Sequence, residues 1–341
     1  MQEARKFKPK TIAYRLVALG VGALLSLSAN KEPSQSKPID SGSFFIVSNP
    51  GSPSIGQTLK NKIQEAQNSL DLQIYALSDK GLIKAINQKA KTTPTFIYYD
   101  PSASKDLKEK IDTKVSLVPY SHKGLMHRKI TVIDKTTCLI GSANYTSSSL
   151  FWHYNNLCVI KSEKLAEFLN AQKRGSCQFE YGKAYLLPDY KNYALMHLIS
   201  KVESAKSSIH LAMFSLTHKK ILESLKSAAL RGVKIYLYID RANFKNLPSG
   251  LEELMTKCEK IYTQNKPVLM HHKLCLIDDM VMITGSSNWS VSGFKKNEEV
   301  LLIFDKLLES DLKSCKEIFL KLQDELELYP YSNKTKDNYI P

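Results

Sequence analysis

The sequence predicts an α/β protein built from two similar domains, each a mixed β-sheet flanked by helices. Strand-like and helix-like segments alternate along its 341 residues, which favours α/β layers. Segments of the first half also recur in the second, so that Tyr75 matches Phe214 at a spacing of 139 residues. An eighteen-residue pattern beginning at His127 returns at His271 with every spacing kept. Together these features indicate an internal duplication of about 140 residues.

The N-terminal segment resembles a targeting sequence. Basic residues precede an apolar run from Leu16 to Leu27, and the small residues Ser28 and Ala29 follow. Such a run has the length of a signal peptide and is short for a membrane span. We therefore expect residues 1–30 to be a signal peptide or an uncleaved N-terminal anchor, with a buried apolar helix as the alternative. The protein would then be exported and be periplasmic, secreted or membrane-anchored.

The first repeat is expected to follow a polar linker at residues 31–43 and to occupy residues 44–172. It opens with the apolar run SFFIVSNP, continues with a helix-like segment from Ile55, and then with the strand-like LDLQIYALS. A second helical pattern, LIKAINQKA, precedes the strand-like FIYYD, which ends at Asp100. The apolar periodicities of 3.6 and 2 residues support these assignments.

The second repeat is expected to occupy residues 184–328, after a linker at residues 173–183. It repeats the same order, with AYLLPD, then a helix-like segment from Tyr193, the strand-like HLAMFSLT, the helical KILESLKSAALRG and the strand-like LYID. Residues 329–341 are expected to form an irregular tail.

Charge and cysteine content restrict the partners. The formal net charge of +15 would fall to about +11 without residues 1–30, so anionic surfaces are expected to bind. Anionic lipid and nucleic acid fit this charge equally well. The six cysteines lack a C-x-x-C spacing, so no metal site is expected, and the cysteines in apolar runs (Cys138, Cys158 and Cys275) are expected to be buried.

The repeated pattern H-x-K-x4-D-x6-G-S-x-N contains the candidate site residues. They are His127, Lys129, Asp134, Ser142 and Asn144 in the first copy, and His271, Lys273, Asp278, Ser286 and Asn288 in the second. Residues two apart on a strand share a face, so each histidine and its lysine should project together. Imidazole, ammonium, hydroxyl and carboxamide groups that converge on one point suit a phosphate group.

The pattern resembles that of the phospholipase D superfamily. This resemblance implies that the domains form one site about a pseudo-twofold axis, without a cofactor, in a chain that is active as a monomer. It further implies that one histidine attacks phosphorus to form a phosphohistidine while the other protonates the leaving group. The lysines and asparagines would hold the phosphoryl oxygens, with Ser142 and Ser286 in support. Asp134 and Asp278 belong to the catalytic motif, but we expect them to act as structural supports.

A difference between the repeats suggests which histidine attacks. We align Glu298 with Asn155, at the place where members of this superfamily orient the histidine of the opposite half. Glu298 would then stabilise the imidazolium of His127, whereas neutral Asn155 would serve His271. His127 is therefore predicted as the nucleophile and His271 as the acid and base. A solvated charge at the end of a strand is the alternative for Glu298.

Three classes of function remain open. A phospholipase D acting on a phospholipid is the first, a metal-independent nuclease is the second, and a non-catalytic binding protein is the third. The length of the chain disfavours cardiolipin-synthase-like transferases, and the G-S-x-N context of the motif serines disfavours a Ser-His-Asp hydrolase. Trp152 and Trp289 follow the two motifs and are expected to contact bases, lie in a lipid interface or pack in the core.

Overall fold

The computed structural model describes residues 44–51, 53–244 and 247–330. The predicted leader at residues 1–30, the linker at 31–43 and the tail from residue 331 lie outside these ranges. Within them, no helix combines the length and the apolar character that crossing a membrane requires.

The first repeat forms a mixed seven-stranded sheet within the described residues, in the order β1-β7-β6-β5-β2-β3-β4. Parallel pairing joins β2 to β3 and β3 to β4, and the other neighbours are antiparallel. The strands are β1 (Phe44–Asn49), β2 (Leu70–Ile74), β3 (Thr95–Tyr99), β4 (Ser116–Pro119), β5 (Lys129–Ile133), β6 (Thr137–Gly141) and β7 (Asn155–Lys161).

The helices of the first repeat pack through apolar faces. In α1 (Ile55–Glu65), Ile55, Leu59 and Ile63 recur every four residues and are buried, while the side chain of Ser54 accepts the N–H of Gln57 as an N-cap. The other helices are α2 (Lys80–Ala90), α3 (Leu107–Lys110), α4 (Ser147–Phe151) and α5 (Glu163–Asn170).

The second repeat forms a mixed nine-stranded sheet in the described part of the chain, ordered β16-β12-β11-β10-β13-β14-β15-β9-β8. Its strands are β8 (Gly175–Phe179), β9 (Gly182–Leu187), β10 (Ser208–Met213), β11 (Lys234–Ile239), β12 (Lys260–Thr263), β13 (Lys273–Ile277), β14 (Val281–Gly285), β15 (Glu299–Phe304) and β16 (Glu327–Leu328). Its helices are α6 (Tyr193–Glu203), α7 (Lys219–Leu230), the 3₁₀ turn η1 (Arg241–Phe244), α8 (Ser249–Met255), α9 (Val291–Lys295) and α10 (Glu309–Glu325).

The two sheets share one strand order, which confirms the predicted pair of α/β domains. The run β1-β7-β6-β5-β2-β3-β4 corresponds to β9-β15-β14-β13-β10-β11-β12, with β8 and β16 added at the two edges of the second sheet. The predicted linker at residues 173–183 contains β8, which pairs with β9 in the second sheet. Tyr329, placed in the predicted tail, stacks on Phe244 with ring centroids 4.2 Å apart.

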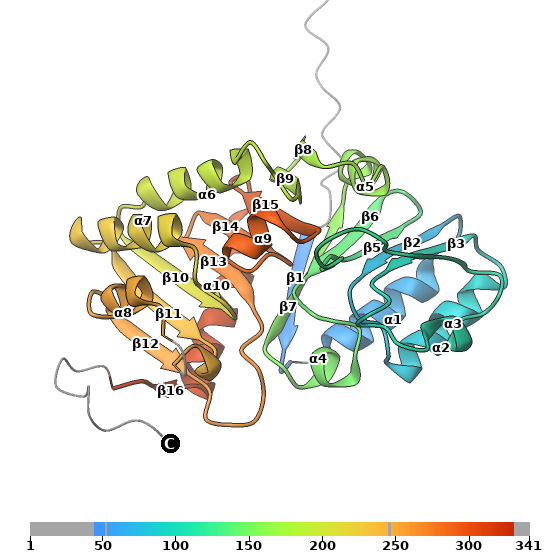
Figure 1. Ribbon diagram of the computed structural model, residues 1–341, viewed down its shortest axis with the longest axis horizontal. Coiled ribbons are helices and arrows are strands. Elements are labelled where there is room, and N and C mark those ends of the chain that lie inside the picture. The colour runs from blue at the N-terminus through green and yellow to red at the C-terminus, as the bar shows by residue number, and fades with distance from the viewer. Residues whose placement is uncertain (1–43, 52, 245–246, 331–341) are drawn as a thin grey trace, which may run out of the picture. The chain divides into compact units, whose positions relative to one another are not determined.

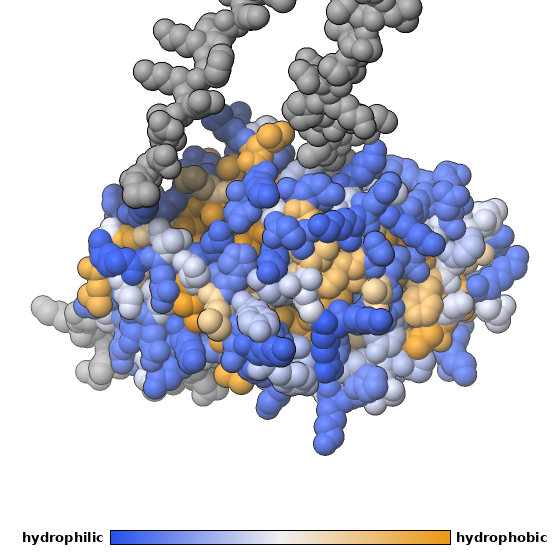
Figure 2. Space-filling view, turned by 90° about the horizontal axis from the view of Figure 1, so that it is seen from above, coloured by the Kyte–Doolittle hydropathy of each residue, from blue (hydrophilic) through white to orange (hydrophobic). Residues whose placement is uncertain are grey.

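The core has three parts. Figure 1 shows α1, α2 and α3 on the outer side of the first sheet and α6, α7 and α8 on the outer side of the second, and an apolar cluster lies under each set. A third cluster joins the domains and includes Ile130 and Ile140 of the first sheet, Leu274 and Leu276 of the second, and Phe319 of α10. This shared core holds the two motif-bearing strands, β5 and β13, in one body. The surface seen from above in Figure 2 is mostly hydrophilic, with apolar side chains gathered in separate patches.

Candidate active site

The two motif histidines lie where the domains exchange backbone hydrogen bonds. The N–H of His127 donates to the carbonyl of Glu298 at 2.8 Å, and the N–H of His271 donates to the carbonyl of Tyr154 at 2.9 Å. Two further hydrogen bonds complete the exchange. The N–H of Glu298 donates to the carbonyl of Leu125 at 2.8 Å, and the N–H of Tyr154 donates to the carbonyl of Leu269 at 2.9 Å. Each domain therefore fixes the backbone position of the other domain's histidine.

The imidazole rings are also oriented across the domain boundary. Nδ1 of His127 lies 2.9 and 3.0 Å from the two carboxylate oxygens of Glu299. Nδ1 of His271 lies 2.9 Å from Oδ1 of Asn155. Both partners accept, so both Nδ1 atoms carry the proton and both Nε2 atoms keep a lone pair for chemistry. Each of the two histidine residues is 7% exposed.

The prediction for Glu298 is wrong by one residue. Glu298 forms an ion pair with buried Arg128 and a second one with Arg174, at 2.7 Å. Adjacent residues of a strand point to opposite faces, so Glu299 occupies the position beside His127. The predicted asymmetry remains, because a carboxylate (Glu299) faces His127 whereas an amide (Asn155) faces His271.

The two motif lysines form a buried cationic pair. Nζ of Lys129 donates to the carbonyl of His127 at 2.6 Å, and Nζ of Lys273 donates to that of His271 at 2.8 Å. Burial lowers the pKa of Lys129 to about 7, although Glu299 and Asp100 act to raise it. Burial and then the Lys129 ammonium hold the pKa of Lys273 well below its ordinary value. An entering anion would therefore favour the charged form of both lysines.

Burial also lowers the pKa of both histidines. For His127 the lowering by burial is opposed by the carboxylate of Glu299. For His271, the nearby Lys273, Lys129 and His127 add to the effect of burial, so its pKa lies well below the ordinary value. These mutual effects place the four groups within one electrostatic environment, which favours neutral imidazoles until an anionic ligand enters.

The serines and asparagines of the motif divide their roles. Oγ of Ser142 donates to Asn155 at 2.9 Å, and Oγ of Ser286 donates to Glu299 at 2.5 Å, so each serine holds the residue that orients a histidine. Oδ1 of Asn144 and of Asn288 is buried without a hydrogen-bond partner in the described structure. These two amide oxygens can accept a hydrogen bond from a donor, whereas a phosphoryl oxygen would need the Nδ2 groups of the same side chains.

The motif aspartates lie outside the reacting centre. The carboxylate of Asp134 accepts the backbone N–H groups of Gln67, Asn68 and Ser69 at 2.6–3.0 Å. Asp278 accepts those of residues 206–208 at 2.8–2.9 Å. Both aspartates have positive φ in the turns that follow β5 and β13. They tie these turns to β2 and β10 and act as structural supports.

A second pair of aspartates supports the site and was not predicted. Oδ2 of Asp100 accepts the N–H of Met126 at 3.0 Å, and Oδ2 of Asp240 accepts the N–H of Met270 at 2.9 Å. Each therefore fixes the backbone immediately before a motif histidine. Their repetition at the ends of FIYYD and LYID was the available signal.

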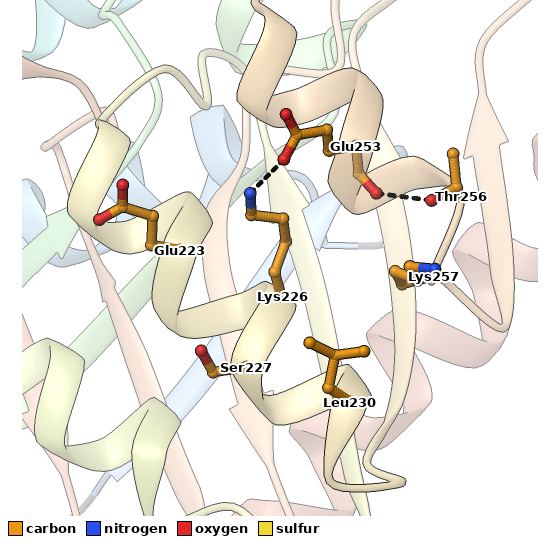
Figure 3. A pocket seen from close by; sticks show the side chains of 7 residues that line it. All are labelled: Glu223, Lys226, Ser227, Leu230, Glu253, Thr256 and Lys257. Atoms are coloured by element: carbon orange, nitrogen blue, oxygen red, sulfur yellow. Dashed lines mark hydrogen bonds and ion pairs between the residues drawn. The ribbon is translucent and has the colours of Figure 1, made fainter.

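Other features of the described residues carry no comparable chemistry. No group of three or more His, Cys, Asp or Glu side chains in these ranges has the arrangement of a metal site. A pocket of about 550 Å³ between α7 and α8 includes Lys226, ion-paired with Glu253, and Leu230 (Figure 3) and contains no motif residue. Of the tryptophans, Trp289 is buried and Trp152 is 68% exposed.

Known proteins resemble this chain over much of its length. The family model described as cardiolipin synthase, PLD-like domain, matches residues 59–173 and again residues 198–322. A phospholipase D of Rickettsia prowazekii is 36% identical over 34% of this chain and 58% of its own length. Cardiolipin synthase 1 of Staphylococcus aureus is 26% identical over 82% of this chain and 67% of its own. The matched region thus spans a little over half the length of the Rickettsia relative.

Solved structures support the fold. Phosphatidylserine synthase of Haemophilus influenzae superposes with a TM-score of 0.65 over 83% of this chain and 87% of its own, at 11% identity. Polyphosphate kinase of Porphyromonas gingivalis superposes with a TM-score of 0.62 over 86% of this chain and 53% of its own, at 13% identity. At these identities the likeness concerns the two-domain α/β fold.

Proposed function

The chain belongs to the phospholipase D superfamily of phosphodiester-acting enzymes, and from that membership we propose that it hydrolyses a phospholipid through a phosphohistidine on His127. The observation that carries this proposal is the pair of cross-domain contacts that orient the two imidazoles, Glu299 with His127 and Asn155 with His271. They leave two Nε2 atoms available beside two buried lysines. This set matches the needs of phosphoryl transfer.

In the proposed first step, Nε2 of His127 attacks phosphorus and the bond to the leaving oxygen breaks. His127 becomes positively charged, and the Glu299 carboxylate stabilises that charge through Nδ1–H. His271 gives its Nε2 proton to the leaving oxygen. The substrate's negative charge would counter the lysines that depress the pKa of His271, so the bound substrate itself favours the protonated acid.

In the second step, neutral His271 takes a proton from water, whose oxygen forms a new bond to phosphorus. The bond between phosphorus and His127 then breaks, and both imidazoles return to their starting states. Lys129 and Lys273 would balance the charge on the non-bridging oxygens throughout, with Asn144 and Asn288 binding beside them.

A phospholipid is the preferred substrate because the relatives are named for lipid chemistry. They include the phospholipase D and cardiolipin synthase above, and a human mitochondrial cardiolipin hydrolase that is 26% identical over 43% of this chain and 56% of its own length. The cardiolipin synthase match favours a second candidate, transfer of the phosphatidyl group to an alcohol in place of water.

One purified sample distinguishes these functions. It is incubated with phosphatidylglycerol vesicles, with phosphatidylcholine vesicles, and with single- and double-stranded DNA. Phosphatidic acid is the expected product, whereas cardiolipin from phosphatidylglycerol would indicate transfer. Cleaved DNA with intact lipid would replace the proposal by the nuclease alternative, and the His127→Ala variant controls for contaminating enzymes.

A further inference from the structure

The two motif histidines are almost fully buried. Because both histidines are only 7% exposed, a substrate would reach them past exposed side chains nearby. We use the name rim for the exposed side chains on segments near the two histidines, and they are Lys123, Leu125, Trp152, Tyr190, Lys266, Leu269 and Lys296.

Two leucines occupy matching places on the rim. Leu125 and Leu269 lie two residues before His127 and His271, and each is 37% exposed. Their carbonyls accept the N–H groups of Glu298 and Tyr154, so each leucine lies where the domains meet. Buried leucines would stabilise the fold, whereas this pair leaves apolar surface beside a polar site on both sides.

Two aromatic side chains extend this apolar surface. Trp152 is 68% exposed and lies two residues from Tyr154, whose N–H binds the carbonyl of Leu269. Tyr190 is 66% exposed, and the Arg174 guanidinium lies 5.6 Å from its ring while forming an ion pair with Glu298. Tryptophan and tyrosine are the residues that concentrate at the interface between water and lipid.

Exposed lysines stand among these apolar groups. Lys123 and Lys266 precede the two leucines in their loops. The backbone of Lys296 lies so close to Gly124 that a Cβ added at Gly124 would come within 2.2 Å of the carbonyl oxygen of Lys296. Within the described ranges none of these three ammonium groups forms an ion pair. The nearby carboxylate of Glu298 is already paired with Arg128 and Arg174.

We propose that the rim docks the enzyme on an anionic phospholipid bilayer, with Trp152, Leu125 and Leu269 in the interfacial layer and the three lysines on lipid phosphates. Apolar anchors surrounded by lysines match a charged membrane surface. A nucleic acid would use the lysines and the tryptophan but gains little from two leucines. This inference rests on the proposed phospholipid substrate and names the surface that presents it.

The two tryptophans of the chain provide the test. In the full-length His127→Ala variant, which should leave the lipid intact, tryptophan emission is recorded as phosphatidylglycerol vesicles are added. Trp152 should shift to shorter wavelength, and phosphatidylcholine vesicles should give a weaker response. Trp152→Phe in the same background should remove the shift, whereas Trp289→Phe should keep it because Trp289 is buried.

Matched variants locate the surface. Leu269→Ser and Lys266→Glu should each weaken vesicle binding by roughly tenfold. Leu230→Ser, on the exposed end of α7 in Figure 3, and Lys234→Glu on β11 should leave it within twofold. Equal losses in the rim and control variants, or an emission shift with single-stranded DNA and none with vesicles, would overturn the docking surface.

Binding and hydrolysis are separate readouts, so the two proposals fail separately. Vesicle binding through Trp152 without lipid hydrolysis by the wild-type enzyme would retain the docking surface and reject the proposed reaction. Hydrolysis of vesicle lipid without a response of Trp152 would retain the proposed reaction and reject the docking surface.

Discussion

Glu299 and Asn155 give two otherwise matching imidazoles different partners. A carboxylate beside Nδ1 stabilises a cationic ring, which His127 would become in the proposed phosphohistidine intermediate. An amide oxygen beside His271 fixes the ring without charge, which suits a group that exchanges a proton in each step. The division of labour in the proposed reaction therefore depends on this one pair of side chains.

Trapping the intermediate should identify the nucleophile. With an activated phosphodiester, whose leaving group needs no protonation, His271→Ala should accumulate a phosphohistidine on His127 because water lacks its base. His127→Ala should form no adduct. Mass spectrometry after an alkaline quench would locate the modification, and an adduct on His271 in the His127→Ala variant would reverse the assignment.

Adjacent glutamates should behave differently on substitution. Glu299→Gln should lower kcat about 10- to 100-fold and move the acidic limb of the pH profile to lower pH. The sign follows because Glu299 raises the pKa of His127, and an imidazole with a lower pKa stays deprotonated in more acidic solution.

Glu298→Ala is the matched control for that change. It leaves buried Arg128 without its carboxylate and should lower the free energy of unfolding by about 3 kcal/mol. Thermal unfolding and pH-rate profiles of both variants separate the effects. A shifted acidic limb in Glu298→Ala but not in Glu299→Gln would show that the wrong glutamate has been assigned to His127.

At the scale of elements, the turns after β5 and β13 align the motif strands with their neighbours. Asp134 and Lys135 both adopt positive φ, of 52° and 56°, as do Asp278 and Asp279. Aspartate tolerates this conformation better than most residues. Because each aspartate also binds three consecutive N–H groups of the chain entering β2 or β10, the turn sets where each motif strand ends.

Asp134→Asn should therefore reduce stability in a pH-dependent manner. Burial acts to raise the pKa of Asp134, but the three backbone N–H groups outweigh it and lower that pKa. A lowered folded-state pKa gives stability that is present above the unfolded value of about 3.9 and is lost as pH falls through the folded value.

Urea unfolding at pH 7 should show a loss of about 1 kcal/mol for Asp134→Asn. The difference in free energy of unfolding between this variant and the wild type should shrink below about pH 4. A gap that is constant down to pH 2 would mean that the carboxylate charge contributes nothing to the turn.

The sequence predicts the elements better than their register. The alternation of KITVID and the recurrence of whole segments place β5, β13 and their neighbours, because apolar periodicity follows from burial. The 144-residue spacing of the two motifs pairs Asn155 with Glu299, so the alignment of Asn155 with Glu298 is out of register by one residue. The structure agrees with that spacing, because Met126 pairs with Glu298 and Glu299 lies beside His127. Asp100 and Asp240 recur at the ends of matching strands, but the backbone N–H groups that they bind are not visible in the sequence, so their role could not be assigned from it. The short GSCQF of β8 lacks the large apolar residues that predict a strand.

At the scale of the whole molecule, both half-sites belong to one body with a shared apolar core. Specific activity should therefore stay constant on dilution, because no second chain has to supply a histidine. Sedimentation at the assay concentrations, together with initial rates over a thousandfold dilution, would test this. Activity that declines in step with dissociation of a dimer would contradict it.

Chelation should leave the reaction unaffected. The positive charge that phosphoryl transfer needs is expected from Lys129 and Lys273, so EDTA should change kcat by less than twofold. Activity lost to EDTA and restored by a divalent cation would mean that the lysines do not balance the charge on the substrate.

The exchanged contacts between the domains also bear on how such an enzyme diversifies. In an assembly of two identical chains, any change in the residue behind one imidazole would appear behind both. Joining the halves in one chain removes that constraint, and a carboxylate stands behind His127 while an amide stands behind His271. Covalent fusion thus permits the two histidines to specialise, so the Asn155→Glu variant, by restoring equivalence, would recreate the less differentiated state.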